Sequence, residues 1–320
     1  MGQRVAITGV GVVDERTPDV ATWLADESEA RRLSRICQLT VAAGRRALAD
    51  AGLDAHGGLA VMVGTEFGDM VSTISFVDGY LGRGPGGLSA LLFPHTVMNT
   101  MAATTAIAVS AKGLSLTLSA LTVAGELAIA RAASAIRAGR VGACLAGGAD
   151  EPAPLVMSAL REAGAAPELR AAGAGFVVLE TFDGARERGA RILGEIAGAA
   201  WRAVPARPHR IGSTASSRAI AAALTEAGAS AAEVGRVYTS ANGDGPREEW
   251  ERALVDAALA PHRLTHRSLS VPAGRHSGLA AHSVATAASE GRDKLALVHA
   301  VARGGNQVAI LVRGPDGSDS

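Results

Sequence analysis

Short apolar runs of strand length alternate with segments of helical apolar spacing along the whole chain. The first run predicts a strand over residues 5–13, and the segment 19–50 that follows is typical of a helix that stops at Gly52. The next elements expected are a strand at 59–63, a helix from about Asp69, a Gly/Pro-rich turn at 82–87 and an apolar helix after Pro94. This order indicates an α/β protein.

The middle of the chain continues the pattern. Leu alternates with Ser and Thr over 114–118, which predicts a strand, and an Ala-rich helix over 125–138 ends at Gly139. A further strand runs into Gly147 and Gly148, and a loop is expected around 152–170. A second series then follows, with strands at 175–180, 192–200, 234–240, 295–302 and 307–312 and helices at 216–227, 247–258 and from near Gly274.

The two series are similar in length and in their order of elements. We therefore expect two halves, residues 1–165 and 166–320, that form one compact unit. The core must be built mainly from small and aliphatic side chains, because 48% of the residues are hydrophobic but only 5 Phe, 3 Trp and 2 Tyr are present. The polar tail 314–320 is expected to fray.

Charge and hydropathy exclude several classes of partner. The 31 Lys and Arg balance 31 Asp and Glu, which argues against a polyanion such as nucleic acid. The opening segment is interpreted as a strand and not as a secretion signal. The long uncharged stretch 84–111 contains Pro94, His95 and Asn99, which a membrane span of about 20 apolar residues would not accommodate. A cytoplasmic protein that does not bind a membrane is expected.

No motif predicts a metal or a cofactor. Cys37 and Cys144 lie far apart without metal-ligand spacing, so neither a disulfide framework nor a zinc site is expected. His95 is interpreted as a hydrogen-bonded histidine of the core or of an interface. The glycines of GVGVVD at 9–14 lack the third glycine of a dinucleotide fingerprint and predict a tight turn. Asp150 and Asp244 are assigned structural roles.

The block 114–150 carries the most specific pattern: a strand, a tight turn at Thr122, a helix, and a strand that ends in Gly-Gly-Ala-Asp. It resembles the β-ketoacyl synthase family of the thiolase superfamily, whose active-site block reads T-A-C-x-S-G, a helix, and A-G-G-A-E. Aligning the glycines without a gap places Thr122 at the position of the nucleophilic cysteine. Gly125, Gly139 and the pair at 147–148 then match the family spacing.

The resemblance covers nearly the whole chain. Similar segments are RVAITGVGVV (4–13), RAAGAGFVVLETFDGARERGARILGEIAG (170–198), VYTSANGDGP (237–246), SVPAGRHSGLAA (270–281) and ARGGNQVAILVR (302–313). It implies a thiolase-like fold, in which two pseudo-duplicated βαβαβ halves form an αβαβα layered sandwich. The chain is shorter than most of the family, and the missing residues fall largely after the first strand.

The departures from the family affect its chemistry. Thr122 replaces the cysteine, Asn242 and Arg275 replace the two histidines, and Ser270 replaces the lysine. An aliphatic hydroxyl needs a general base to attack a thioester, whereas a cysteine at a helix N-terminus is readily ionised. Asparagine cannot transfer a proton and arginine is permanently charged. These substitutions predict a chain that is not catalytic on its own.

Two further positions bear on the site. A slip of one residue would place His276 at the second histidine position, but Gly274 and Gly278 match the family spacing only if Arg275 stands there. Arg303 occupies the place of a phenylalanine that gates the acyl entrance in the family. An arginine there would obstruct the entrance or make it polar.

Family members without the nucleophile are similar to the chain-length factor, the noncatalytic subunit that forms a heterodimer with an active ketosynthase in type II polyketide synthases. The resemblance implies that the strand 114–119 pairs across the dimer axis and that an acyl carrier protein docks on the complex. It also directs the helix after residue 64 toward a shared acyl tunnel. Met70, Thr73 and Val77 lie on one helical face, with Phe76 beside them; the alternative is that these four are ordinary core residues.

Two other functions remain open at this point. The chain could be a homodimeric acyltransferase or an esterase-like enzyme that uses Thr122, or His276 with a different nucleophile, on an acyl thioester. It could also be a purely structural stabiliser of a partner ketosynthase.

Overall fold

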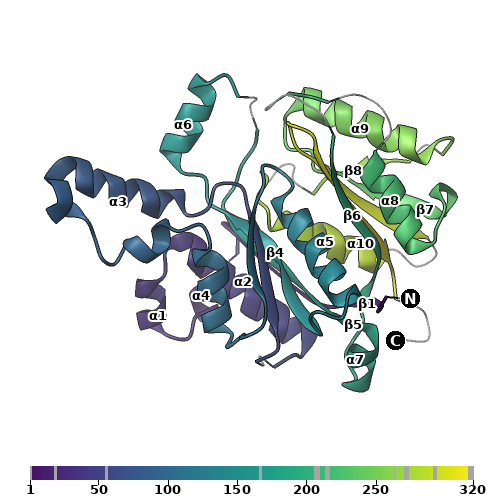
Figure 1. Ribbon diagram of the computed structural model, residues 1–320, viewed down its shortest axis with the longest axis horizontal. Coiled ribbons are helices and arrows are strands. Elements are labelled where there is room, and N and C mark those ends of the chain that lie inside the picture. Colours follow the sequence, from purple (N-terminus) through teal and green to yellow (C-terminus); the bar gives the residue numbers. More distant parts are fainter. Residues whose placement is uncertain are drawn as a thin grey trace.

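A computed structural model describes residues 2–17, 20–54, 57–165, 168–204, 210–212, 217–262, 264–269, 274–290 and 294–315. Over these residues the strands form one mixed sheet in the order β3-β2-β4-β5-β1-β6-β10-β9-β7-β8 (Figure 1). The strands are β1 (Val5–Asp14), β2 (Ala60–Thr65), β3 (Ser115–Ser119), β4 (Ala143–Asp150), β5 (Gly173–Thr181), β6 (Gly194–Ala203), β7 (Val234–Tyr238), β8 (His266–Arg267), β9 (Leu295–Val301) and β10 (Asn306–Arg313).

The sheet consists of two halves with the same internal order. The first reads β3-β2-β4-β5-β1, and the second repeats this order, from the other edge, as β8-β7-β9-β10-β6. The halves meet where β1 pairs with β6 over only two residue pairs, Ala6 with Glu195 and Ile7 with Gly194. Each half has parallel outer strands and an antiparallel strand, β5 or β10, next to its first strand. The predicted thiolase-like fold with duplicated halves is confirmed.

The position of the boundary between the halves, placed after residue 165, stays a prediction. The strand β5 follows that boundary in the sequence but pairs with β4 and β1 of the first half.

Helices occupy three layers around the sheet halves (Figure 1). The helices α2 (Arg35–Ala51) and α4 (Thr100–Ala108) pack on the outer face of the first half. In the second half, α8 (Arg218–Ala227) and α9 (Gly245–Leu259) take the corresponding place. The central layer consists of α5 (Ala124–Arg137) and α10 (Leu279–Glu290), which contact strands of both halves. Alanine supplies many of the buried side chains of both central helices, which allows the two helices to pack closely against both halves of the sheet.

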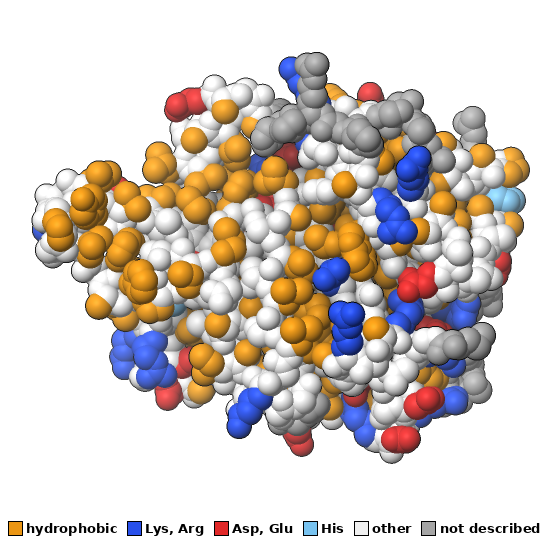
Figure 2. Space-filling view, viewed as in Figure 1, with side chains coloured by type: hydrophobic (Ala, Val, Ile, Leu, Met, Phe, Trp, Pro, Cys, Tyr) orange, Lys and Arg blue, Asp and Glu red, His pale blue; other side chains and the backbone are white. Residues whose placement is uncertain are grey.

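An arm extends from the first half (Figure 1). It consists of α3 (Met70–Arg83) and the 3-10 turns η2 (Gly84–Gly87) and η3 (Phe93–Thr96). Ser72 is the buried residue of α3. Apolar side chains gather on the surface of this arm, as Figure 2 shows. The most exposed of them include Val77, Tyr80, Leu81, Leu88, Leu91 and Phe93.

Most predicted elements are present, but five predictions differ from the structure. The tight turn expected at 9–14 is absent, because β1 runs as one strand from Val5 to Asp14. The single helix expected over 19–50 is divided into η1 (Val20–Trp23), α1 (Glu27–Arg32) and α2, because the backbone of Leu33 and Ser34 is extended. The helices α6 (Pro154–Glu162) and α7 (Phe182–Glu187) and the two-residue strand β8 were not predicted. The described helix α6 buries none of its residues, so it replaces part of the expected loop without adding to the core. No helix among the described residues is long and apolar enough to cross a membrane.

Candidate functional site

Thr122 lies in the turn that joins β3 to α5. Its φ angle is +63°, in the left-handed region that a β-branched residue rarely adopts, and it is buried. The Thr122 amide donates a hydrogen bond to Oε1 of Glu66 at 3.1 Å. Among the described residues, the Thr122 hydroxyl makes no hydrogen bond to a histidine or a carboxylate. The tight turn predicted at Thr122 is therefore present, and its hydroxyl has no hydrogen-bonded base among the described residues.

The side chain of Arg275 contacts both the Thr122 turn and the first turn of α5. Its Nε donates to the carbonyl oxygen of Thr122 at 3.2 Å, and its Nη2 lies 2.8 Å and 3.0 Å from the two carboxylate oxygens of Glu126. Both side chains are 3% exposed. One guanidinium nitrogen of Arg275 thus contacts both oxygens of a buried carboxylate at the N-terminal end of α5, next to Thr122.

Gly125 is the residue that lets Arg275 come this close. A Cβ atom on Gly125 would lie 1.9 Å from the carbonyl oxygen of Ser277. The absence of a side chain therefore allows the turn at 274–278 to rest directly on the first turn of α5.

The buried carboxylates of Glu66 and Asp150 form hydrogen bonds around the Thr122 turn. Asp150, at the end of β4, accepts hydrogen bonds from the Glu66 amide at 2.7 Å and from the Ser277 amide at 2.7 Å. Glu66 also accepts from Nε of Arg170 at 3.1 Å. Burial, and then the charge of Asp150, raise the pKa of Glu66, and burial raises the pKa of Asp150. The Asp150 carboxylate thus joins β2, β4 and the 274–278 turn, and Asp244 does not pair with it.

Asn242 reaches the site through the backbone of Leu169. The Leu169 amide donates to the Asn242 carbonyl at 2.7 Å, and the Leu169 carbonyl accepts from the Arg275 amide at 2.7 Å. The side-chain oxygen of Asn242 accepts from Nη2 of the fully buried Arg247 at 2.6 Å. Asn242 is therefore held as a hydrogen-bond acceptor, and its role contains no proton transfer.

His276 faces away from Thr122. It packs against β5, where a Cβ atom on Gly173 would lie 2.5 Å from its Nε2. Burial, partly offset by the charge of Asp14, lowers the pKa of His276 to about 4. The imidazole is neutral at physiological pH, and no hydrogen bond joins it to Thr122 among the described residues. Arg275 contacts Thr122 directly. Which of the two residues stands at the second histidine position stays a prediction.

The remaining predicted residues lie in different places. Ser270 lies outside the described residues. Arg303 makes a bidentate contact to Asp244, with both N–O distances 2.6 Å, beside the N-terminus of α9. Its role as an altered gate stays a prediction.

The four predicted tunnel residues lie on the arm, on α3. Met70, Thr73 and Phe76 are half-buried and Val77 is 45% exposed, so none belongs to the buried core of this chain. The ring of Phe76 packs on Phe93 of η3 with 6.1 Å between the centroids. Their exposed faces are free for contacts outside the chain.

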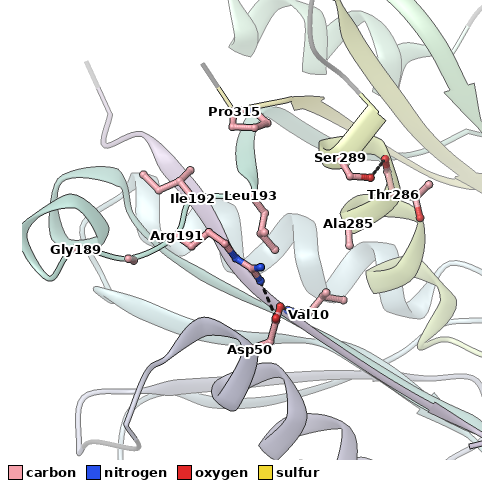
Figure 3. Close-up of a pocket in the computed structure, with 11 residues that line it drawn as sticks. Val10, Asp50, Gly189, Arg191, Ile192, Leu193, Ala285, Thr286, Ser289 and Pro315 are labelled. Atoms are coloured by element: carbon pink, nitrogen blue, oxygen red, sulfur yellow. Dashed lines mark hydrogen bonds and ion pairs between the residues drawn. The ribbon is translucent and has the colours of Figure 1, made fainter. Parts of the chain in front are cut away.

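One cavity among the described residues adjoins the site, and a larger cleft lies apart from it. A small one of about 260 Å³ lies beside α6 and reaches Glu168 and Arg170, which contacts the Glu66 that binds Thr122. A wide cleft of about 880 Å³ lies elsewhere, between α10 and the segment that precedes β6 (Figure 3). The ion pair of Arg191 and Asp50, 2.7 Å long, crosses one side of this cleft. The Thr122 turn lines neither cavity.

Several residues of the site were not predicted. Glu66, Glu126, Arg170 and Arg247 are charged, yet each side chain is buried or nearly so. For Glu126 a signal was present, because this acidic residue interrupts the otherwise apolar beginning of an Ala-rich helix. A charge in such a position is usually paired.

These observations define a class of protein: a thiolase-like scaffold with a buried threonine in the left-handed turn before the central helix α5 and a buried Arg275–Glu126 ion pair beside that turn. The chain belongs to the β-ketoacyl synthase family. Residues 3–181 match the family model described as Beta-ketoacyl synthase, N-terminal domain.

Relatives of known name are ketosynthases. The chain is 30% identical over 296 residues to the granaticin polyketide putative beta-ketoacyl synthase 1 of Streptomyces violaceoruber. This alignment covers 82% of this chain and 70% of that protein. It is 27% identical over 247 residues to the 3-oxoacyl-[acyl-carrier-protein] synthase 2 of Vibrio cholerae. That alignment covers 68% of this chain and 58% of the Vibrio cholerae protein. Of a second such synthase, from Vibrio harveyi, the chain spans 48%.

Solved structures share the fold over almost the entire chain. The ishigamide ketosynthase/chain length factor superposes with a TM-score of 0.86 at 20% identity, over 98% of this chain and 100% of that chain. A type II polyketide synthase acyl-carrier protein in complex with its ketosynthase bound to the hexaketide gives 0.81 at 19% identity, over 99% and 100% of the two chains.

Proposed function

We propose that the chain is a noncatalytic subunit, similar to a chain-length factor, that pairs with an active ketosynthase in a type II polyketide synthase and helps to shape its acyl tunnel. The observation that carries the proposal is the buried pair of Arg275 and Glu126 beside Thr122. It fills the place where a working site needs a neutral, proton-transferring imidazole. The partner subunit would supply the reactive cysteine and both histidines.

The chemistry of the turn favours this function over an acyltransferase that uses Thr122. A threonine hydroxyl attacks a thioester only when a nearby base accepts its proton. Arg275 is always protonated, Asn242 is not a base, and the buried His276 packs against Gly173 and not against Thr122. Among the described residues, no hydrogen bond joins the Thr122 hydroxyl to a base, and the Glu66 carboxylate accepts from the Thr122 amide instead.

The surface of the first half supports a dimer. The strand β3 is an edge strand of the sheet, and its outer side presents unpaired backbone groups. Apolar side chains on the arm and on α4 adjoin this region, with Leu81 74% and Ile107 79% exposed. Such a combination of an open edge and apolar surface is typical of an obligate interface. We propose that β3 pairs with its equivalent in the partner ketosynthase.

The arm supports the tunnel role. Because Met70, Thr73, Phe76 and Val77 are not in the core of this chain, their side chains are available to line a space shared with the partner. A closed apolar tunnel cannot accept further methylenes without strain of about 1–3 kcal/mol, so the volume of these side chains would limit the length of the product. An acyl carrier protein would deliver the chain to the complex, and the cytoplasm is the proposed location.

The test is co-expression of the chain with its genomically neighbouring ketosynthase and measurement of the product lengths. Enlarging the tunnel with Met70→Ala or reducing it with Thr73→Trp should lengthen or shorten the products. Thr122→Ala should leave condensation almost intact. Unchanged product lengths with intact complex formation would reject the tunnel role and leave the chain a structural stabiliser of its partner. A covalent acyl adduct on Thr122, found by intact mass measurement of the chain with acyl thioesters, would establish the enzyme alternative.

A further inference from the structure

Three potential metal ligands from three separate elements meet beneath the arm. Cys37 lies in the first turn of α2, Asp69 is the N-cap residue of α3, and His95 is in η3. One ligand atom from each side chain lies within 4.8 Å of the other two. Cys37 is 0%, Asp69 5% and His95 7% exposed. The spacing along the chain gave no indication of this cluster, because the ligands are brought together only by the fold.

The hydrogen bonding of His95 leaves one ring nitrogen without a partner. Its Nε2 lies 3.1 Å from the carbonyl oxygen of Arg32, which can only accept, so Nε2 carries the proton. In the neutral ring Nδ1 is then an acceptor, and it is buried without a hydrogen-bond partner in the described structure. Histidine ligands of metals show this same arrangement, in which the distal N–H is bonded to a backbone carbonyl.

The unpartnered Nδ1 of His95 lies near a second acceptor, the carboxylate of Asp69. It lies 3.9 Å from Oδ2 of Asp69, which is too long for a hydrogen bond even if the ring were doubly protonated. Asp69 itself already accepts two hydrogen bonds from Ser72, at 3.0 Å and 2.9 Å. A buried ring nitrogen without a hydrogen-bond partner, 3.9 Å from a buried carboxylate oxygen, is placed so that a cation can bind to both.

We propose that Cys37, Asp69 and His95 bind one divalent transition-metal ion, for which zinc is the best match. Thiolate, imidazole and carboxylate are the three ligand types of zinc, and a fourth position is left for water. Bonds of about 2.0–2.3 Å to a tetrahedral ion separate the ligand atoms by roughly 3.3–3.7 Å. The ligand atoms lie within 4.8 Å of one another, with Nδ1 and Oδ2 3.9 Å apart, so they would move closer together on binding.

A metal ion bound to these three side chains would join α2, α3 and η3, and so hold the base of the arm.

The experiment uses the untagged full chain, treated with a chelator and then titrated with Co²⁺ as a spectroscopic probe. We expect one Co²⁺ per chain, with a thiolate-to-cobalt charge-transfer band that Zn²⁺ abolishes by displacement. Cys37→Ala should remove the band, and His95→Gln should weaken binding by more than about 100-fold. The matched control is Cys144→Ala, which removes the other buried cysteine and should leave the band unchanged.

The proposal is overturned if the wild-type chain binds no stoichiometric Co²⁺, or if the band survives in Cys37→Ala. Should Cys37→Ala fail to fold, Asp69→Asn provides a second variant, because asparagine retains the helix cap while removing the anionic ligand. Binding by Asp69→Asn equal to that of the wild type, with the band also intact in His95→Gln, would likewise reject the site. The outcome does not depend on the proposed partner or tunnel.

Discussion

Nη2 of Arg275 lies 2.8 Å from Oε1 of Glu126, and this ion pair is almost fully withdrawn from solvent. The pair connects the turn before α10 to the first turn of α5, the two helices of the central layer. Because Arg275 also binds the Thr122 carbonyl, the residue that we propose to replace a catalytic histidine is part of the packing between the two helices.

The first prediction concerns this pair. Glu126→Gln would leave the Arg275 charge buried without a counter-ion, and we expect a loss of about 3–5 kcal/mol in the free energy of unfolding. The double variant Glu126→Leu with Arg275→Met should lose less than Glu126→Gln, because it removes both charges. The measurement is denaturant unfolding of the three proteins.

The matched control for the ion pair is Glu27→Gln. Glu27 pairs with Arg31 at 3.5 Å on the surface, where the side chains are 91% and 73% exposed. Its loss should change stability by less than about 0.5 kcal/mol. If Glu126→Gln were no more costly than this control, the pair would contribute nothing to the packing of the central layer.

The second prediction concerns the close approach at Gly125. An alanine there would place its Cβ 1.9 Å from the Ser277 carbonyl oxygen, and only movement of backbone can relieve the contact. We expect Gly125→Ala to destabilise the chain by more than about 3 kcal/mol or to prevent soluble expression. Gly142→Ala is the control, since nothing lies within 4 Å of a Cβ at that position. Equal melting temperatures for the two variants would contradict the close packing of α5 on the 274–278 turn.

The fold was predictable from the sequence to a large extent, and particular residues show why. The runs that became β1, β4 and β5 are buried on both faces, so their apolar stretches mark them clearly. The helix α6 has no buried residue and the strand β8 has only two residues, so neither leaves a comparable pattern.

The sequence predicted which residues come together, but not the hydrogen bonds between them. The family resemblance selected Thr122, Asn242 and Arg275, and the structure joins them through Leu169 and direct hydrogen bonds. Their correspondence to the catalytic positions of the family stays a prediction. The partners Glu66 and Arg170 could not be predicted, because they lie 104 residues apart and meet only in the folded chain. The same limit applies to Cys37 and His95, whose approach depends on how the arm folds back over α2.

The third prediction follows from His276. Its pKa is about 4 in the folded chain against 6.5 in the unfolded one, so the unfolded state binds more protons between these values. Above pH 6.5 the imidazole is neutral in both states and does not lower the free energy of unfolding. As the pH drops toward 4, the unfolded state takes up a proton that the folded state does not, so the free energy of unfolding falls. We expect the free energy of unfolding of the wild type, relative to His276→Gln, to fall by roughly 3 kcal/mol between pH 7 and pH 4.

The comparison with the variant is needed because other groups titrate in the same range. The carboxyl groups of Glu66 and Asp150 have raised pKa values, and their effect on stability has the opposite sign. Both groups are present in wild type and variant and cancel in the difference. A difference that does not change with pH would mean that His276 is not buried as the structure has it.

The last prediction concerns the surface proposed to bind the partner. Ile107 on α4 and Leu81 on α3 are 79% and 74% exposed, so glutamate at either position should change the stability of the isolated chain by less than about 0.5 kcal/mol. In a dimer both side chains would be buried against apolar surface, where an unpaired carboxylate is costly.

We expect Ile107→Glu or Leu81→Glu to abolish co-purification with the co-expressed ketosynthase. Ala221→Glu, an exposed position on α8 at the opposite outer layer, should leave co-purification intact. Retention of the partner by both Ile107→Glu and Leu81→Glu would exclude this face as the interface, since an interface that buries the apolar arm cannot accept both charges.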